Sequence, residues 1–209
     1  MLASLGIAVF LAVCLAFFWG VNLYNLRRHS TERRGEEYRA EVDRPGGVAV
    51  MLAAFGTGVF FLESGLYIIL AFMDHFWILG DSVFQLRFSF DSQVQLSGIV
   101  ITGFGYALFI WSVLARGKFA TSWEMPQNQE LVTWGPYRYV RHPSYLAYFI
   151  LFTGFFLIVL NLLAAIPLVA IPGYVGLVNR EEELLTRRFG VEYLKYRRKT
   201  GRFLPRRKT

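Results

Sequence analysis

The chain has 209 residues, of which 55% are hydrophobic, and a formal net charge of +7. Several uncharged runs exceed the roughly 18 residues that mark a membrane span, which argues against a soluble globular domain. In a membrane protein, the excess of Lys and Arg indicates a basic cytoplasmic face and attraction to anionic lipid rather than nucleic-acid binding. The length suits one domain, and the lone Cys14 rules out an intrachain disulfide or a thiolate metal cluster.

The amino-terminal half predicts three membrane-spanning helices, over residues 1–26, 48–73 and 93–115. The first of these runs has no charged side chain and lacks the basic start and small-residue cleavage site of a signal peptide. Residues 27–46 mix Arg with Glu and Asp, which is typical of a solvated helix with ion pairs. The aromatic residues of 74–92 indicate an external loop at the membrane interface.

Two features inside these spans need an explanation. Glu63 interrupts the second span, and a carboxylate at that depth costs about 2.5–3.5 kcal/mol, so it is expected to face the bundle or a cavity. Glycines at 56, 58, 98, 103 and 105 are interpreted as sites of close helix packing, because a dinucleotide-binding motif needs a strand, a turn and a helix start around it.

The stretch from residue 131 to 145 is too polar and too broken by proline to span a bilayer. Gly135 and Pro136 signal a turn, and Pro143 suits the first turn of a helix that continues into apolar sequence. Residues 146–178 carry no charge and predict two short helices that turn near Asn161, the second of them irregular at its prolines.

The tail begins at Arg180 and combines a basic face with apolar residues at helical spacing, which favours one helix lying on the membrane surface. The apolar positions are Leu184, Leu185, Phe189, Tyr193 and Tyr196.

The distribution of Lys and Arg orients these spans. There are six in residues 27–46, one in 74–92, four in 116–144 and eleven in 180–209. With five spans, the three basic segments fall on one side of the membrane. The positive-inside rule therefore predicts an amino terminus outside and a carboxyl terminus in the cytoplasm.

Two polar clusters are expected to meet on that cytoplasmic face, because the helical hairpin between them begins and ends there. One consists of Tyr137, Arg138, Arg141, His142, Ser144 and Tyr145, and the other of Arg180, Glu181, Glu182 and Glu183. Aromatic side chains suit an adenine or a sulfonium, and carboxylates accept hydrogen bonds from ribose or an ammonium. The same residues also suit a purely topological role as interface charges and helix-end charges.

The pattern that decides between these interpretations is a combination of motifs. Residues 135–145 read GPYRYVRHPSY, a hairpin-length gap follows, Glu181 and Glu182 come next, and residues 189–196 read FGVEYLKY. This combination, which extends over about residues 131–205, resembles the isoprenylcysteine carboxyl methyltransferase family, which belongs with the membrane phospholipid methyltransferases.

The resemblance implies a five-helix, all-α integral membrane protein whose last two spans form the short hairpin. It also implies a cytoplasmic cofactor pocket closed by the carboxyl-terminal helix. By position, S-adenosylmethionine, which becomes S-adenosylhomocysteine, would be held by Gln129, Glu130, Leu131, Val132, Tyr137, His142, Pro143, Ser144, Tyr145, Glu181 and Glu182. No metal site is expected.

The implied reaction is methyl transfer to a lipophilic acceptor that enters from the bilayer, above all carboxyl O-methylation of a prenylated cysteine. Arg180 and Glu181 are the expected catalytic residues. Family members often carry an arginine about four residues before the matching Glu, and this chain has Leu177 there, so Arg180 is the nearest substitute.

Three other functions stay open at this level. An amine of a phospholipid or a small thiol would be a different acceptor, and each needs a nearby base. A non-enzymatic membrane scaffold would instead bind anionic lipid through the basic tail. We treat residues 1–209 as a single polytopic domain, with 1–130 supplying amino-terminal spans and 131–209 the catalytic region.

Overall fold

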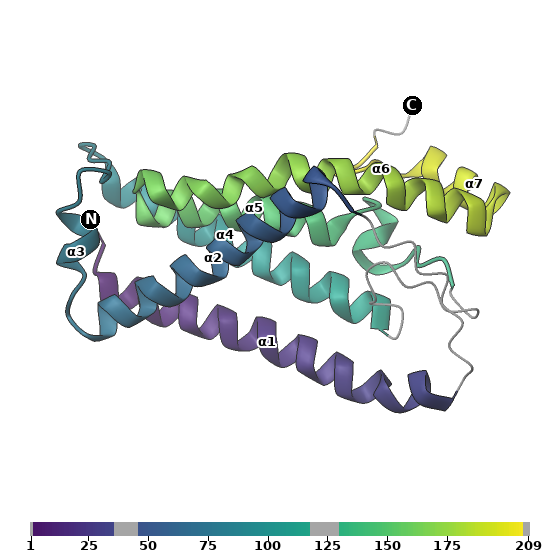
Figure 1. The fold of residues 1–209 in the computed structure, drawn as a ribbon, viewed down its shortest axis with the longest axis horizontal. Helices are drawn as coiled ribbons and strands as arrows, with labels where there is room; N and C mark the ends of the chain where they lie inside the picture. The colour runs from purple at the N-terminus through teal and green to yellow at the C-terminus, as the bar shows by residue number, and fades with distance from the viewer. Residues whose placement is uncertain (1, 36–45, 118–129, 207–209) are drawn as a thin grey trace.

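The computed structural model describes residues 2–35, 46–117 and 130–206, with side chains omitted for 29–35. Within these ranges the chain is helical and contains no β-strand beyond two isolated bridges. The helices in chain order are α1 Ser4–Gly35, α2 Val48–Phe72, α3 Trp77–Gly80, α4 Asp91–Arg116, η2 Gly135–Arg138, α5 Pro143–Val159, η3 Leu162–Val169, α6 Ala170–Phe189 and α7 Val191–Lys199. Figure 1 shows the long helices running along the long axis, with the amino terminus and α3 at one end and α7 at the other.

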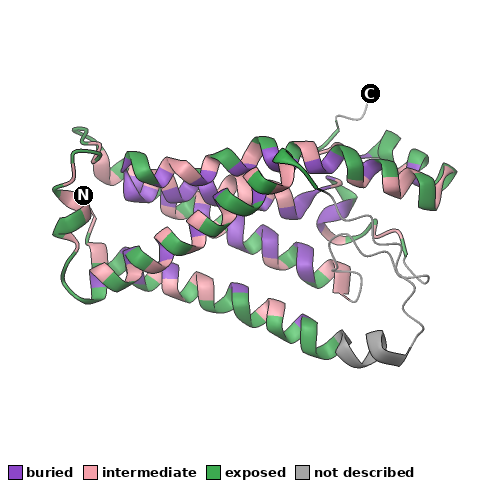
Figure 2. Cartoon of the chain, viewed as in Figure 1, coloured by how far each residue is buried: buried purple, intermediate pink, exposed green. Residues whose placement is uncertain are grey.

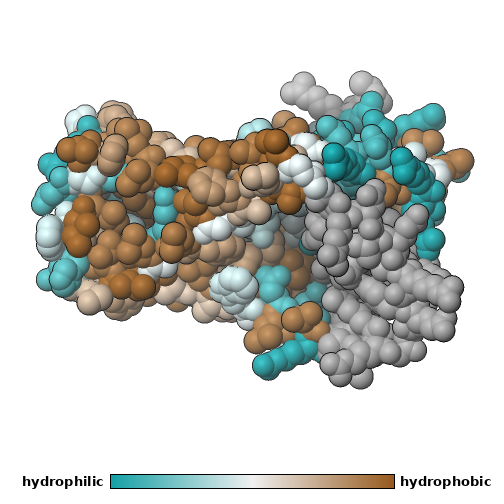
Figure 3. Space-filling view, in the orientation of Figure 1, coloured by the Kyte–Doolittle hydropathy of each residue, from teal (hydrophilic) through white to brown (hydrophobic). Residues whose placement is uncertain are grey.

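Four of these helical segments are long and apolar enough to cross a membrane, namely Ser4–Arg28, Val48–Phe72, Asp91–Arg116 and Leu162–Phe189. The three predicted amino-terminal spans are therefore confirmed as candidate membrane helices. Figure 3 shows apolar residues over the middle of the molecule and hydrophilic residues gathered at its ends. Large apolar side chains such as Phe17, Leu62 and Phe104 are more than half exposed there, which suits contact with lipid.

The fifth predicted span corresponds to α5, which is apolar but has only 17 residues. At 1.5 Å per residue it is about 26 Å long, slightly shorter than the roughly 30 Å hydrocarbon core of a bilayer. The number of confirmed candidate spans is therefore four.

The predicted turn near Asn161 is confirmed. Leu160 ends α5 in the left-handed conformation, and the Asn161 side chain caps the next helix by accepting a hydrogen bond of 3.0 Å from the backbone N–H of Leu163. The irregularity predicted around the prolines is also present, because Pro167 lies in the 3-10 helix η3 and a regular α-helix begins only at Ala170.

The prediction of one surface helix from Arg180 onward is wrong in two respects. Arg180 lies within α6, which continues without a break from the apolar segment to Phe189. Gly190 then ends α6 with a positive φ of 50°, and α7 starts at Val191. The first turns of the charged tail are therefore a rigid extension of a candidate membrane helix.

Close helix packing explains three of the five glycines considered above. A Cβ at Gly105 would lie 3.0 Å from the side chain of Leu151, whereas one at Gly103 would make only an ordinary contact of 3.8 Å with Phe10. A Cβ at Gly98 would lie 2.8 Å from the backbone nitrogen of Ile158, and a Cβ at Gly56 would lie 2.8 Å from the Cβ of Ala170. These positions allow α4 to approach α5 and α2 to approach η3 and α6. Gly58 faces open space, so the packing interpretation is wrong for that position.

The core is centred on α5. Ala147, Leu151, Phe152 and Ile158 are fully buried, and Figure 2 shows buried residues concentrated where α4, α5 and α6 face one another. Glu63 on α2 is partly buried, and its Oε2 is buried with no hydrogen-bond partner among the described residues.

Candidate functional site

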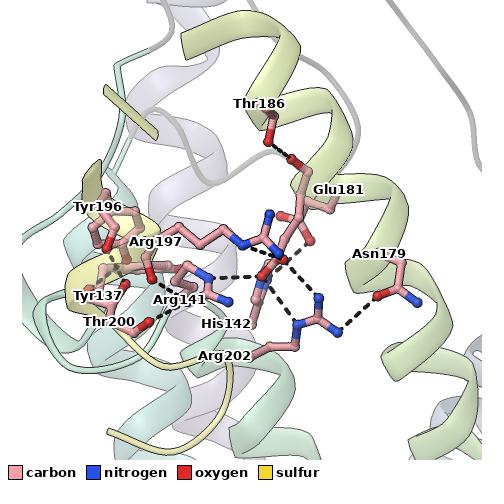
Figure 4. A network of polar contacts seen from close by, with 11 residues as sticks. Tyr137, Arg141, His142, Asn179, Glu181, Thr186, Tyr196, Arg197, Thr200 and Arg202 are labelled. Atoms are coloured by element: carbon pink, nitrogen blue, oxygen red, sulfur yellow. Dashed lines mark hydrogen bonds and ion pairs between the residues drawn. The ribbon is translucent and has the colours of Figure 1, made fainter. Parts of the chain in front are cut away.

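One buried carboxylate connects three segments at the polar end of the bundle. Glu182 on α6 has a side chain that is only 5% exposed. Its Oε1 accepts a hydrogen bond of 2.9 Å from Nε of Arg141, and its Oε2 accepts one of 2.9 Å from Nη2 of Arg202 (Figure 4). Arg141 precedes α5 and Arg202 follows α7, so Glu182 joins the loop before α5 to both α6 and the tail.

The backbone of the tail is attached to the same loop. The N–H of Arg141 donates to the carbonyl of Gly201 at 2.9 Å, and the N–H of His142 donates to the carbonyl of Arg202 at 3.2 Å. The guanidinium of Arg141 also donates to the carbonyl of Thr200. A Cβ at Gly201 would collide with the carbonyl oxygen of Leu204, so the turn that the tail makes after α7 requires glycine at position 201.

A second contact fixes α7 to the turn before α5. The hydroxyl of Tyr196 donates to the carbonyl of Tyr137 at 2.7 Å. The neighbouring Tyr193 is fully buried. Burial raises the pKa of the Tyr196 hydroxyl, which keeps it protonated as a donor at neutral pH.

A cavity of about 190 Å³ lies beside this network. Its lining comes from α1, α4, η2, the loop before α5, α5 itself and α6. The residues are Asn22, Phe109, Val113, Arg116, Tyr137, Arg141, His142, Ser144, Tyr145, Tyr148 and Glu181. The lining therefore combines aromatic rings with both signs of charge.

His142 forms the wall between Glu182 and the cavity. Its Nε2 lies 3.3 Å from Oε1 of Glu182, and its Nδ1 lies 3.5 Å from Oε2 of Glu181. The ring is buried and stacks on Tyr145 with an interplanar angle of 4°. Burial lowers the pKa of His142, but the two carboxylates raise it by more than burial lowers it. The net pKa is therefore above the usual value of 6.5. The two carboxylates therefore favour the imidazolium form of His142.

Ser144 links the cavity to α4. It is buried, and its Oγ lies 2.8 Å from Oγ of Ser112 and accepts a hydrogen bond of 3.2 Å from Nη2 of Arg116. Ser112 donates its own proton to the carbonyl of Phe109, so Ser144 is the donor between the two serines. This arrangement leaves the Arg116 guanidinium at the cavity wall.

The structure brings five of the predicted site residues into the cavity lining: Tyr137, His142, Ser144, Tyr145 and Glu181. Pro143 is buried as the first residue of α5. Glu182 lies behind His142 and serves the network described above.

The other predicted residues lie elsewhere. Glu130, Leu131 and Val132 belong to the irregular segment before η2 and are not among the lining residues, and Gln129 lies outside the described ranges. Arg180, expected to act on the acceptor, donates instead to the carbonyl of Gly46 at 3.3 Å and does not line the cavity. Successive residues of an α-helix point about 100° apart, which separates Arg180 from Glu181.

Sequence reasoning did not find the lining residues on α1 and α4, which are Asn22, Phe109, Val113 and Arg116, or Tyr148 on α5. Two of them carried a usable signal. Asn22 is one of two asparagines in a mostly apolar span, and Arg116 is a cation at the end of the span that precedes the polar loop.

The isosteric change Glu182→Gln is expected to destabilise the fold by about 3–5 kcal/mol, because Arg141 would remain buried without a compensating charge. The measurement is the free energy of unfolding of the purified protein in detergent. Glu183→Gln is the matched control, since Glu183 is exposed on the same helix, and its effect should stay within about 0.5 kcal/mol. Equal effects of the two changes would contradict a central role for Glu182.

The raised pKa of His142 predicts a pH dependence of stability. A group whose pKa is raised by folding stabilises the folded state below its unfolded pKa, and this contribution is lost as pH rises through the folded value. The melting temperature in detergent should therefore fall from about pH 6.5 upward through that value, and His142→Gln should flatten this part of the profile. His75→Gln, at the exposed loop between α2 and α3, is the control. Parallel profiles for wild type and His142→Gln would refute the assignment.

Comparison with known proteins agrees with the motif pattern. Residues 94–192, which include every lining residue of the cavity except Asn22, match the family model described as phospholipid methyltransferase. A search of curated proteins finds no match. Residues 94–192 therefore belong to the phospholipid methyltransferase family, in the superfamily that also contains the isoprenylcysteine carboxyl methyltransferases.

Proposed function

We propose that this protein is an S-adenosylmethionine-dependent membrane methyltransferase that methylates a lipophilic acceptor. The observation that carries the proposal is the cavity in the family domain, where His142, Tyr145 and Glu181 meet at the polar end of an apolar bundle. A boundary between apolar and polar surface suits a reaction between a charged cofactor and a membrane-soluble acceptor.

The residues in the cavity fit this cofactor. When bound, S-adenosylmethionine supplies a methyl group on a positively charged sulfonium. The rings of Phe109, Tyr145 and Tyr148 offer faces that attract a cation. Glu181 lines the cavity and contacts His142 through Oε2 at 3.5 Å, and its remaining lone pairs suit a hydroxyl or ammonium donor.

The size of the cavity limits which part of the cofactor it encloses. Its volume of about 190 Å³ is below the roughly 300–1,000 Å³ of typical small-molecule sites. One end of the cofactor therefore belongs inside, with the remainder toward the opening. Closure of this end is the role that we assign to the tail, which Glu182 and Arg202 hold against the loop before α5.

The proposed topology has five spans, with the amino terminus outside and the cavity on the cytoplasmic side. The uneven distribution of Lys and Arg supports this orientation. So does the position of the amino terminus and α3 at the end opposite α7 (Figure 1). The short α5 would cross with the hairpin formed by η3 and α6.

A carboxylate is the acceptor group that the cavity favours, as in O-methylation of a prenylated cysteine. A carboxylate is ionised at neutral pH and needs no base, whereas an amine or a thiol must lose a proton. Each ring nitrogen of His142 faces a carboxylate, at 3.5 and 3.3 Å, and these contacts favour the protonated ring, which makes His142 a poor general base. The residues of the cavity then act by binding, orienting and excluding water.

Methylation of a phospholipid amine is the second candidate, because the matched family model carries that description. In this case Glu181, the carboxylate in the cavity lining, would be the proton acceptor.

S-adenosylhomocysteine is expected to raise the melting temperature of the wild-type protein in detergent, since ligand at 100 times its dissociation constant adds about 2.7 kcal/mol. Glu181→Ala should abolish most of this shift, because it removes a polar group from the cavity, while Glu183→Ala should retain it. A wild-type protein that does not respond to this ligand would refute the proposal and favour a lipid-binding scaffold.

The acceptor can be identified with labelled cofactor and three compounds tested in parallel, namely N-acetyl-S-farnesylcysteine, phosphatidylethanolamine and a simple alkanethiol. We expect label on the farnesylcysteine, with a rate that changes little above pH 6 because its carboxylate is already ionised. Transfer to phosphatidylethanolamine alone, rising with pH, would instead establish the amine reaction.

A further inference from the structure

Three of the described residues that line the cavity have cationic side chains, and two of them are held by acceptors of the protein itself. Arg141 donates to Glu182 and to the carbonyls of Arg197 and Thr200. His142 contacts Glu181 and Glu182. These two cations therefore serve the fold rather than a ligand.

Arg116 is different. Its Nη2 donates to Ser144 at 3.2 Å, but its Nε is buried and donates to no acceptor among the described residues. A buried guanidinium N–H without a partner is costly, so this group calls for an acceptor from a ligand. Ser144, the acceptor of the Nη2 hydrogen bond, is itself fixed by its contact with Ser112 at 2.8 Å.

A negative group with spare capacity faces the same cavity. Glu181 on α6 also lines the cavity, and its Oε2 lies 3.5 Å from Nδ1 of His142 without a closer hydrogen bond among the described residues. The other lone pairs of this carboxylate are available to a ligand. Arg116 and Glu181 both line this cavity. The cavity thus offers one guanidinium and one carboxylate, which is the complement of an amino-acid zwitterion.

We propose that Arg116 binds the α-carboxylate at the methionine end of the cofactor and that Glu181 receives its α-ammonium. This inference rests on the proposed function, and it assigns a role to a residue outside the polar loop and the tail. The small enclosed volume agrees, since it suits the amino-acid end better than the whole molecule.

A purely structural role does not account for Arg116. A cation in the last turn of a helix interacts favourably with the helix dipole, and Arg116 has that position on α4. A side chain serving only the dipole would be expected to point into solvent. Arg116 instead lines the cavity and has a buried Nε.

The test compares two ligands that differ only at the amino-acid end. S-adenosylhomocysteine carries the α-carboxylate and α-ammonium, and 5′-methylthioadenosine keeps the adenosine and thioether without them. Dissociation constants are measured by calorimetry on the full chain in detergent. The test variants are Arg116→Gln and Arg116→Lys. The control is Arg138→Gln, which also removes one positive charge but from an exposed site beside Tyr137.

Arg116→Gln is expected to weaken S-adenosylhomocysteine binding by roughly 10- to 100-fold, the usual worth of a hydrogen bond to a charged group, and to change 5′-methylthioadenosine binding less than about twofold. Arg116→Lys should give an intermediate loss, because it keeps the charge but not the fork of donors. Arg138→Gln should bind both ligands as wild type does. The lysine variant keeps the test decisive if Arg116→Gln does not fold.

Equal effects of Arg116→Gln on the two ligands, or no effect on either, would overturn the inference while leaving the proposed function intact. Unchanged S-adenosylhomocysteine binding with weaker binding of N-acetyl-S-farnesylcysteine would also overturn it and assign the carboxylate to the acceptor. A wild-type protein that binds neither adenosine compound would overturn the proposed function and this inference together.

Discussion

The polar end of this protein depends on the burial of one carboxylate. Removing Glu182 from water is costly, and the cost is offset only because Arg141, His142 and Arg202 reach it from two other segments of the chain. All three cations are distant from Glu182 in sequence, and only the fold brings them next to it. The ion pairs that stabilise the buried carboxylate therefore also fix how the loop before α5, α6 and the tail lie together.

This arrangement separates the tasks of two neighbouring acidic residues. Glu181 and Glu182 are adjacent on a continuous helix, so their side chains leave the axis about 100° apart. Glu182 points into the ion-pair network, and Glu181 lines the cavity. His142 lies between them and contacts both. A site built in this way has one rigid wall, because the groups behind it are already satisfied.

The apolar part of the molecule decides where this site lies. Glycine at positions 56 and 98 lets α2 and α4 approach their neighbours closely, which packs the aromatic core around α5. As a result, the end of α4, the start of α5 and the polar part of α6 all lie at the cavity. Because α6 extends past the apolar region without a break, its glutamates are held by a rigid element and not by a loop. Rigid support of this kind is what a binding site requires.

The sequence by itself determined the features that depend on local composition and periodicity. These are the three amino-terminal helices, the turn at Asn161, the irregular helix at Pro167 and the polar loop that contains His142. It also carried the motif that the family match confirms over residues 94–192. Only the tertiary structure decided which charged side chains share a cavity. Arg180 and Arg116 both end near the polar face, and their directions are set by the rotation of α6 and α4 in the bundle. That rotation is fixed by packing between helices far apart in sequence, which no single segment encodes.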